Sequence, residues 1–186
     1  MKAPFLRLLW PIIAVGAALA LACSCDSGKS DHPSKKTTPA KPVSTPATEP
    51  PITLDLTQVL TKADAEAILG KGVSAPVVKT TAGKVVACTY TAKDLSEISM
   101  FVRVTSTPSK ARLLFETANK HSKTLAKMRL NPVANLGDAA YWAGGYLNQL
   151  NVLKGRYWII FSAQSVGDRA QKLTKLAAAK ALPRLP

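Results

Sequence analysis

Residues 147–163 read LNQLNVLKGRYWIIFSA, and this pattern predicts a β-hairpin whose turn lies at Lys154-Gly155. We expect one strand from Leu147 to Leu153 and a second from Arg156 to Ala163. Both faces of the second strand are apolar: one carries Tyr157, Ile159, Phe161 and Ala163, and the other carries Trp158 and Ile160. A strand of this kind is typical of the centre of a sheet that is covered on both sides.

The segment before this hairpin predicts a helix and three strands. Thr61 and Asp64 form a capping-box pattern that opens a helix from Lys62 to Leu69, and Gly70 closes it. Three strands are expected to follow, at residues 77–79, 85–90 and 98–104. In each of the last two, every second side chain is apolar, so one face is expected to be buried.

Two further helices are predicted by apolar residues at helical spacing. The longer begins at Pro108 and runs to about Lys127, and one more strand follows it at residues 139–142. The last helix is expected to be capped by Asp168 and stopped by Pro183.

The predicted order of elements is αβββαβββα, which favours an α+β fold in the form of a two-layer sandwich. The stretch from Cys88-Thr89-Tyr90 to Pro108-Ser109 looks like the stretch from Ala140-Tyr141-Trp142 to Gly167-Asp168. An internal duplication of a helix-plus-three-strand unit would explain this likeness. The alternative is chance, because α+β domains often repeat such units.

The amino terminus has the pattern of an export signal. Lys2 and Arg7 precede an apolar run from Leu8 to Ala22, and small residues stand before Cys23. Residues 1–22 are therefore expected to be a cleaved signal peptide. An uncleaved membrane anchor is the alternative, but the run is shorter than the roughly 20 residues that a spanning helix needs, and Pro11 interrupts it.

The sequence Ala20-Leu21-Ala22-Cys23 resembles the lipobox of bacterial lipoproteins, in which the cysteine sulfur receives a diacylglycerol. The resemblance implies lipidation at Cys23 and attachment to a membrane through two or three acyl chains. Cys25 competes for this role but has the poorer lipobox. By resemblance to enterobacterial lipoproteins, Ser24 after an acylated Cys23 permits sorting to the outer membrane, whereas Asp26 after Cys25 favours the inner one.

Residues 23–51 are predicted to be a tether, and residues 52–186 a single α+β domain. The tether is rich in Pro, Ser, Thr and Lys and cannot form a core. A solvated spacer fits this composition, and so does an O-glycosylated or wall-crossing segment.

The chain is strongly basic, with a formal net charge of +14. The leader contains Lys2 and Arg7 and no acid, so the rest of the chain has 23 basic and 11 acidic side chains and a net charge of +12. In an envelope such a charge suits an anionic lipid, an anionic glycan or exogenous DNA, and an envelope protein is a further candidate partner, while the export signal argues against intracellular nucleic acid. The candidate residues for an anionic partner are the lysines on the outer helix faces, Lys120, Lys123, Lys127, Lys172 and Lys175.

Three short motifs support a family resemblance. They are Leu60 to Gly70, Cys88-x-Tyr90 and Leu136-Gly137-Asp138-x-Ala140-x-Trp142, and a basic helix closes the chain. Together they resemble a group of small bacterial lipoproteins of unknown function, best represented in actinobacteria, whose domain is an α+β sandwich. Members often pair the cysteine of the Cys-x-aromatic motif with one before the first helix, but residues 52–57 contain no cysteine.

The residues that could carry catalysis are few. The two histidines are His32 in the tether and His121 at the edge of a helix stripe. Neither comes with a nucleophile in a recognisable pattern, and no metal or cofactor is expected. Cys88 is expected to be either a buried small hydrophobe or the partner of Cys25 in a disulfide.

Two functions from different classes remain open. The first is a non-catalytic binding or accessory module of the cell envelope, and the second is a carrier or sensor of lipid or another small ligand. An aromatic group could line a ligand groove or could pack in the core: Tyr141, Trp142, Tyr146, Tyr157 and Trp158. An enclosed cavity would favour the carrier, and a filled core the module.

Overall fold

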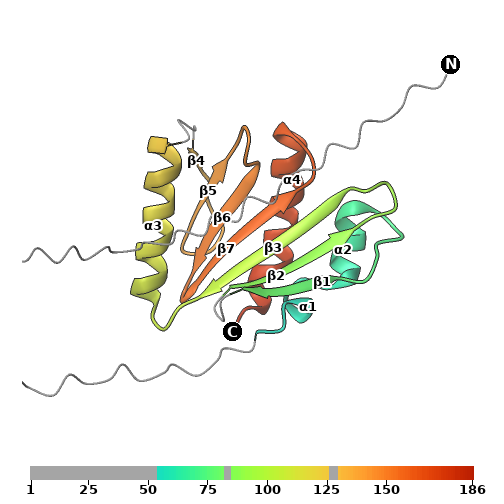
Figure 1. Cartoon of the computed structure of the whole chain (residues 1–186), viewed down its shortest axis with the longest axis horizontal. Helices are drawn as coiled ribbons and strands as arrows, with labels where there is room; N and C mark the ends of the chain where they lie inside the picture. The colour runs from blue at the N-terminus through green and yellow to red at the C-terminus, as the bar shows by residue number, and fades with distance from the viewer. Residues whose placement is uncertain (1–53, 82–84, 126–129) are drawn as a thin grey trace, which may run out of the picture. The chain divides into compact units, whose positions relative to one another are not determined.

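The computed structural model describes residues 54–81, 85–125 and 130–186 (Figure 1). The predicted signal peptide, the tether, Cys23, Cys25 and Lys127 lie outside this part of the chain, and what was predicted of them stays a prediction.

A seven-stranded antiparallel sheet is the centre of the fold, in the order β1-β2-β3-β7-β6-β5-β4 (Figure 1). The strands are β1 Val77–Thr81, β2 Val85–Thr91, β3 Glu97–Val104, β4 Leu130–Pro132, β5 Ala139–Ala143, β6 Gln149–Lys154 and β7 Tyr157–Ala163. The α+β class is confirmed. The predicted hairpin is also found, but its turn is Gly155-Arg156 instead of Lys154-Gly155, because Lys154 pairs with Tyr157; its second strand, β7, is the middle strand of the sheet.

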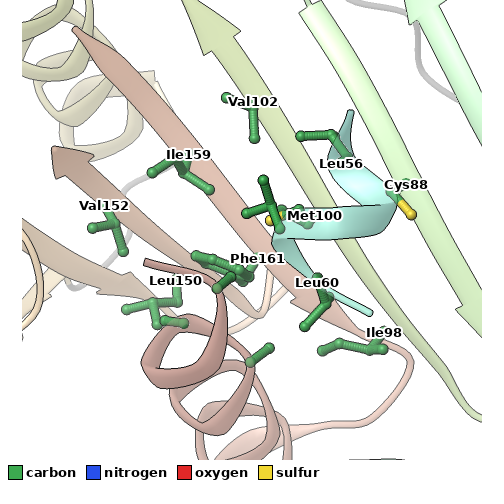
Figure 2. Close-up of a cluster of buried hydrophobic side chains, with 14 of the residues drawn as sticks. Leu56, Leu60, Cys88, Ile98, Met100, Val102, Leu150, Val152, Ile159 and Phe161 are labelled. Atoms are coloured by element: carbon green, nitrogen blue, oxygen red, sulfur yellow. The ribbon is translucent and has the colours of Figure 1, made fainter. Parts of the chain in front are cut away.

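The main core lies between one face of this sheet and four helical elements. These are α1 Leu56–Val59, α2 Lys62–Leu69, α4 Gly167–Ala181 and the 3₁₀ helix η1 Leu182–Arg184. Side chains such as Met100, Ile159 and Phe161 have no exposed surface, and Figure 2 shows them in one cluster with Leu56 and Leu60. Each such large apolar side chain contributes about 1.5–3 kcal/mol on burial.

The other face of the sheet is covered by α3, Pro108–Leu125. Ala111 and Phe115 pack on Tyr141 and Leu153, which lie on β5 and β6. A second helical layer therefore lies over β5, β6 and β7, and the two-layer prediction is wrong for this half. The physical reason is that β6 and β7 carry apolar side chains on both faces, so each face needs a cover.

Other predictions need smaller corrections. The order αβββαβββα omits α1, the three-residue strand β4 and η1, each of which is too short to give a periodic pattern. Asp168 is not the cap of α4: the N-cap is Val166, which has no side-chain hydrogen bond, and Asp168 lies in the first turn. The duplication stays a prediction, since each half contains a strand meander but α3 and α4 lie on opposite faces of the sheet.

The motif Leu136-Gly137-Asp138 stabilises the β6–β7 turn through hydrogen bonds. The N–H of Asp138 donates to the Leu153 carbonyl at 2.7 Å, and Asp138 Oδ2 accepts from the N–H of Gly155 at 2.7 Å. Gly137 has a φ of +60°, and a Cβ there would lie 2.3 Å from the Leu153 oxygen. Only glycine fits this close approach of two backbones.

A buried carboxylate joins α2 to the carboxyl terminus. Asp64 completes the predicted capping box with Thr61, and its side chain also accepts hydrogen bonds from Arg184. Lys180 Nζ lies 3.6 Å from Asp64 Oδ1. The hydrogen bonds from Arg184 are the main reason that the pKa of Asp64 lies well below its ordinary value, against the opposing effect of burial.

We expect Asp64→Asn to lower the free energy of unfolding by about 2 kcal/mol at pH 7, because it leaves Arg184 without its charged acceptor while keeping a side chain that can cap. A carboxylate whose folded pKa is depressed stabilises the fold above its unfolded pKa of about 4 and loses that effect as the pH falls further. The difference between the two proteins should therefore be constant above about pH 5 and shrink below about pH 4.

Urea unfolding at a series of pH values measures this difference. The matched control is Lys62→Gln, which breaks an exposed pair with Glu66 of 3.9 Å and should change stability by less than about 0.5 kcal/mol. An equal loss for Asp64→Asn at pH 3 and pH 7 would contradict the ionic account.

Candidate functional site

The helix α3 covers only one half of its face of the sheet. It packs against β4, β6 and β7, and no comparable packing of α3 on β1 or β2 occurs in the described chain. The uncovered half is called the open face below. Its side chains are Val77, Lys79, Thr81, Val85, Ala87, Thr89, Thr91, Glu97, Ser99, Phe101, Arg103 and Ile160.

Strand register arranges the open face in rows. Lys79 lies opposite Ala87, which lies opposite Phe101, and Phe101 lies opposite Ile160. Phe101 is 37% exposed although it is in the third strand of seven. The centre of the open face is therefore an apolar strip with an aromatic ring that no helix covers.

The two ends of the open face differ in chemistry. At one end Thr89 Oγ1 and Ser99 Oγ form a hydrogen bond of 2.9 Å, and beside them Thr91 Oγ1 donates to Glu97 Oε1 at 3.1 Å. At the other end Arg103 is exposed, and no ion pair joins it to another described residue. The basic end is suited to an anionic group, and the adjacent strip to an apolar one.

A surface hollow of about 210 Å³ adjoins the basic end, where the chain passes from β3 into α3. It is lined by Arg103, Val104, Thr105, Ser106, Lys110, Leu113 and Leu114. Lys110 Nζ donates to Ser106 Oγ at 2.8 Å, and Leu113 is 65% exposed. Two cationic side chains thus lie beside apolar surface, an arrangement that can hold a carboxylate or phosphate with an apolar substituent.

The predicted lysines do not form one surface. Lys120 and Lys123 are exposed on α3, whereas Lys172 and Lys175 are exposed on α4, on the opposite side of the sheet. Lys172 and Lys175 also line a shallow hollow of about 360 Å³. A flat anionic surface can therefore contact one pair at a time but not both.

The predicted aromatic group is divided in the same way. Tyr141 and Trp158 lie on the side of α3, and Trp142 and Tyr157 belong to the main core. Burial raises the pKa of the Tyr141 hydroxyl to about 12. Tyr146 is 95% exposed in the β5–β6 turn. The five residues do not line one groove, and four of them pack as core or at its margin.

The Cys-x-Tyr motif has a structural role. Cys88 is a free thiol without exposed surface beside Leu56 of α1 (Figure 2), and burial raises its pKa. Tyr90 donates from its hydroxyl to the Leu60 carbonyl at 2.5 Å. The motif therefore fixes α1 and the following turn on β2, and Cys88 packs as the small hydrophobe that was one of its two predicted roles.

Groups with catalytic potential lie apart. His121 is exposed on α3, and Asp64 and Asp138 are engaged by Arg184 and by the β6–β7 turn. Within the described ranges no three residues of the His, Cys, Asp and Glu types gather as metal ligands would. No helix among the same residues is long and apolar enough to cross a membrane.

Sequence reasoning missed the open face as a site. The available signal was Phe101, a large aromatic residue between Met100 and Val102, on the face that Ser99 and Arg103 make polar. It did not suffice, because whether α3 covers that face depends on where the helix packs.

Comparisons with known proteins give a distant structural similarity. No family model matches the chain, and no curated protein matches it significantly. Among solved structures, the extracellular domain of PknH from Mycobacterium tuberculosis is similar, with 11% sequence identity and a TM-score of 0.45. The match covers 69% of this chain and 95% of the PknH domain.

Proposed function

We propose that this chain is a membrane-anchored lipoprotein of the cell envelope and that its folded domain acts as a non-catalytic binding or accessory module. The open face is its contact surface. The observation that carries this proposal is the exposed strip around Phe101 with Arg103 at its basic end, on the half of the sheet face that α3 does not cover.

The partner has to match this surface. An extended acidic segment of an envelope protein or glycan fits it best, because Lys79 and Arg103 adjoin the strip and the strip lies on strands, with Glu97 at the opposite end. The pairs Lys120 with Lys123 and Lys172 with Lys175 lie off the open face and supply only long-range attraction for an anionic partner.

A carrier of lipid or another small ligand is the alternative function. It is supported by the apolar and basic lining of the hollow at Arg103 and Leu113. That hollow is open to solvent and measures about 210 Å³, whereas sites for drug-sized ligands usually enclose about 300–1,000 Å³. The main core beneath the sheet is filled with fully buried side chains, which supports the module.

Anchoring is tested at the predicted lipobox. Cys23→Ala should abolish incorporation of labelled fatty acid and release the protein from the membrane fraction or block its processing. Cys25→Ala is the matched control and should leave both unchanged. Labelling that persists in Cys23→Ala and disappears in Cys25→Ala would move the anchor to Cys25.

The contact surface is tested by replacing Phe101 with the photo-cross-linker p-benzoylphenylalanine in the living cells that make the protein. The matched position is Leu176, which is 42% exposed on α4 and so resembles Phe101 in exposure. We expect a discrete adduct from position 101, absent from position 176, and at least about tenfold weaker after Arg103→Glu, because a reversed charge repels an anionic partner.

Two outcomes would contradict the module. One is an equal set of adducts from both positions. The other is a lipid or small molecule that co-purifies with the protein in about one-to-one ratio, which would favour the carrier.

A further inference from the structure

Three connections lie side by side at one end of the sheet. They are the β2–β3 turn at residues 92–96, the β5–β6 turn at residues 144–148 and the β7–α4 connection at residues 164–166. We call this the loop end.

The register of the strands brings these connections together. Ile98, at the start of β3, pairs with Ala163 at the end of β7, and Gln149, at the start of β6, pairs with Ser162. With strands about 4.8 Å apart, the centres of the two turns are separated by about 15 Å. The connection between β7 and α4 emerges between them.

The loop end exposes large apolar side chains. Each connection has one such residue: Leu95 is 72% exposed, Tyr146 is 95% exposed and Val166 is 78% exposed. Leu147, next to Tyr146, is 41% exposed. These fractions are among the highest of any large apolar residue in the described chain. Single exposed apolar residues are common, but a group of them on adjacent loop tips calls for an explanation.

The turn that carries Leu95 is held in place. The N–H of Leu95 donates to the Ala92 carbonyl at 2.9 Å, and Asp94 Oδ1 accepts from both the N–H and the hydroxyl of Ser96. Leu95 itself has a φ of +66°, which is uncommon for a residue other than glycine. The hydrogen bonds therefore keep an apolar side chain directed outward in a conformation that local preference disfavours.

Basic and acidic side chains both surround the tips. Lys93 lies two residues before Leu95 in the same turn and is exposed. Arg169 and Lys172 are exposed on the first turns of α4. Three acids lie in the same segments, Asp94, Glu97 and Asp168, and the first two accept hydrogen bonds from Ser96 and Thr91. Attraction to an anionic surface therefore comes from the net positive charge of the whole chain, and the three cations provide local contacts within it. Apolar tips beside cations are the composition that binds the interface of an anionic membrane.

We propose that the loop end docks on an anionic membrane surface. Leu95, Tyr146 and Val166 enter the interfacial region, and the ammonium and guanidinium groups of Lys93, Arg169 and Lys172 lie beside lipid phosphates. Tyrosine is well suited to this depth, because its ring is apolar and its hydroxyl is polar. A fluid interface accommodates separate tips spread over about 15 Å, whereas a protein partner would need a preformed surface complementary to all three.

This inference rests on the membrane location in the proposed function, and it adds a direct contact of the folded domain. The test uses the chain from Ser24 to Pro186, which has all described residues and lacks Cys23. Binding to vesicles of phosphatidylcholine with phosphatidylglycerol, and of phosphatidylcholine alone, is measured by co-sedimentation.

The test variant is Leu95→Asn with Tyr146→Ser and Val166→Ser, a combination chosen to preserve the fold. Asparagine tolerates a positive φ better than leucine. Serine at position 166 supplies the N-cap hydrogen bond that α4 lacks, so thermal stability should be kept or raised. The matched control removes three other exposed apolar side chains, through Val78→Thr, Leu113→Gln and Leu176→Gln.

We expect the unaltered chain and the control to bind the anionic vesicles with affinities within about threefold of each other. The test variant should bind at least about tenfold more weakly, because each lost side chain removes apolar burial. Equal binding of the test variant and the unaltered chain would overturn the proposal. Absence of binding by the unaltered chain would also overturn it and would assign the tips to a protein partner, while the tests at Cys23 and position 101 would stand unaffected.

Discussion

The pairing of β3 with β7 is the contact on which the rest of the structure depends. It runs from Ile98 with Ala163 to Val104 with Tyr157 and joins the meander of β1–β3 to that of β4–β7. A meander alone cannot bury its apolar face, but the joined sheet gives α4 a surface that spans both halves. Because the partners are distant in sequence, we infer that this pairing forms late in folding and that both meanders depend on it.

The register of that one pairing also determines which surfaces remain exposed. It places the connections around Leu95, Tyr146 and Val166 at the same end of the sheet, and it places Phe101 opposite Ile160 on the face that α3 leaves open. The two surfaces differ in chemistry, since one is a set of separate apolar tips and the other is a continuous strip with a basic end. If both proposals hold, the loop end meets a membrane and the open face meets a second partner, and the two contacts use different residues.

Much of the fold could be predicted from the sequence, because its signals are local. The capping box at Thr61 and Asp64, the alternation in β2 and β3, and the two apolar faces of β7 all led to the observed elements. The missing parts depend on tertiary contacts. Arg184 and Asp64 form their hydrogen bonds although they are 120 residues apart in the sequence. The short helix α1 is stabilised by packing on β2. No periodic pattern in the sequence indicates which side of the sheet α3 covers.

The most direct test of the account is amide hydrogen exchange of the chain from Ser24 onward, with and without anionic vesicles. The account predicts slower exchange at the loop end, in residues 92–96, 144–148 and 164–166, with no change in β1 and β2, since the open face stays free for its partner. Slower exchange in β1 and β2 without change at the loop end would show that the open face meets the membrane and would contradict the account.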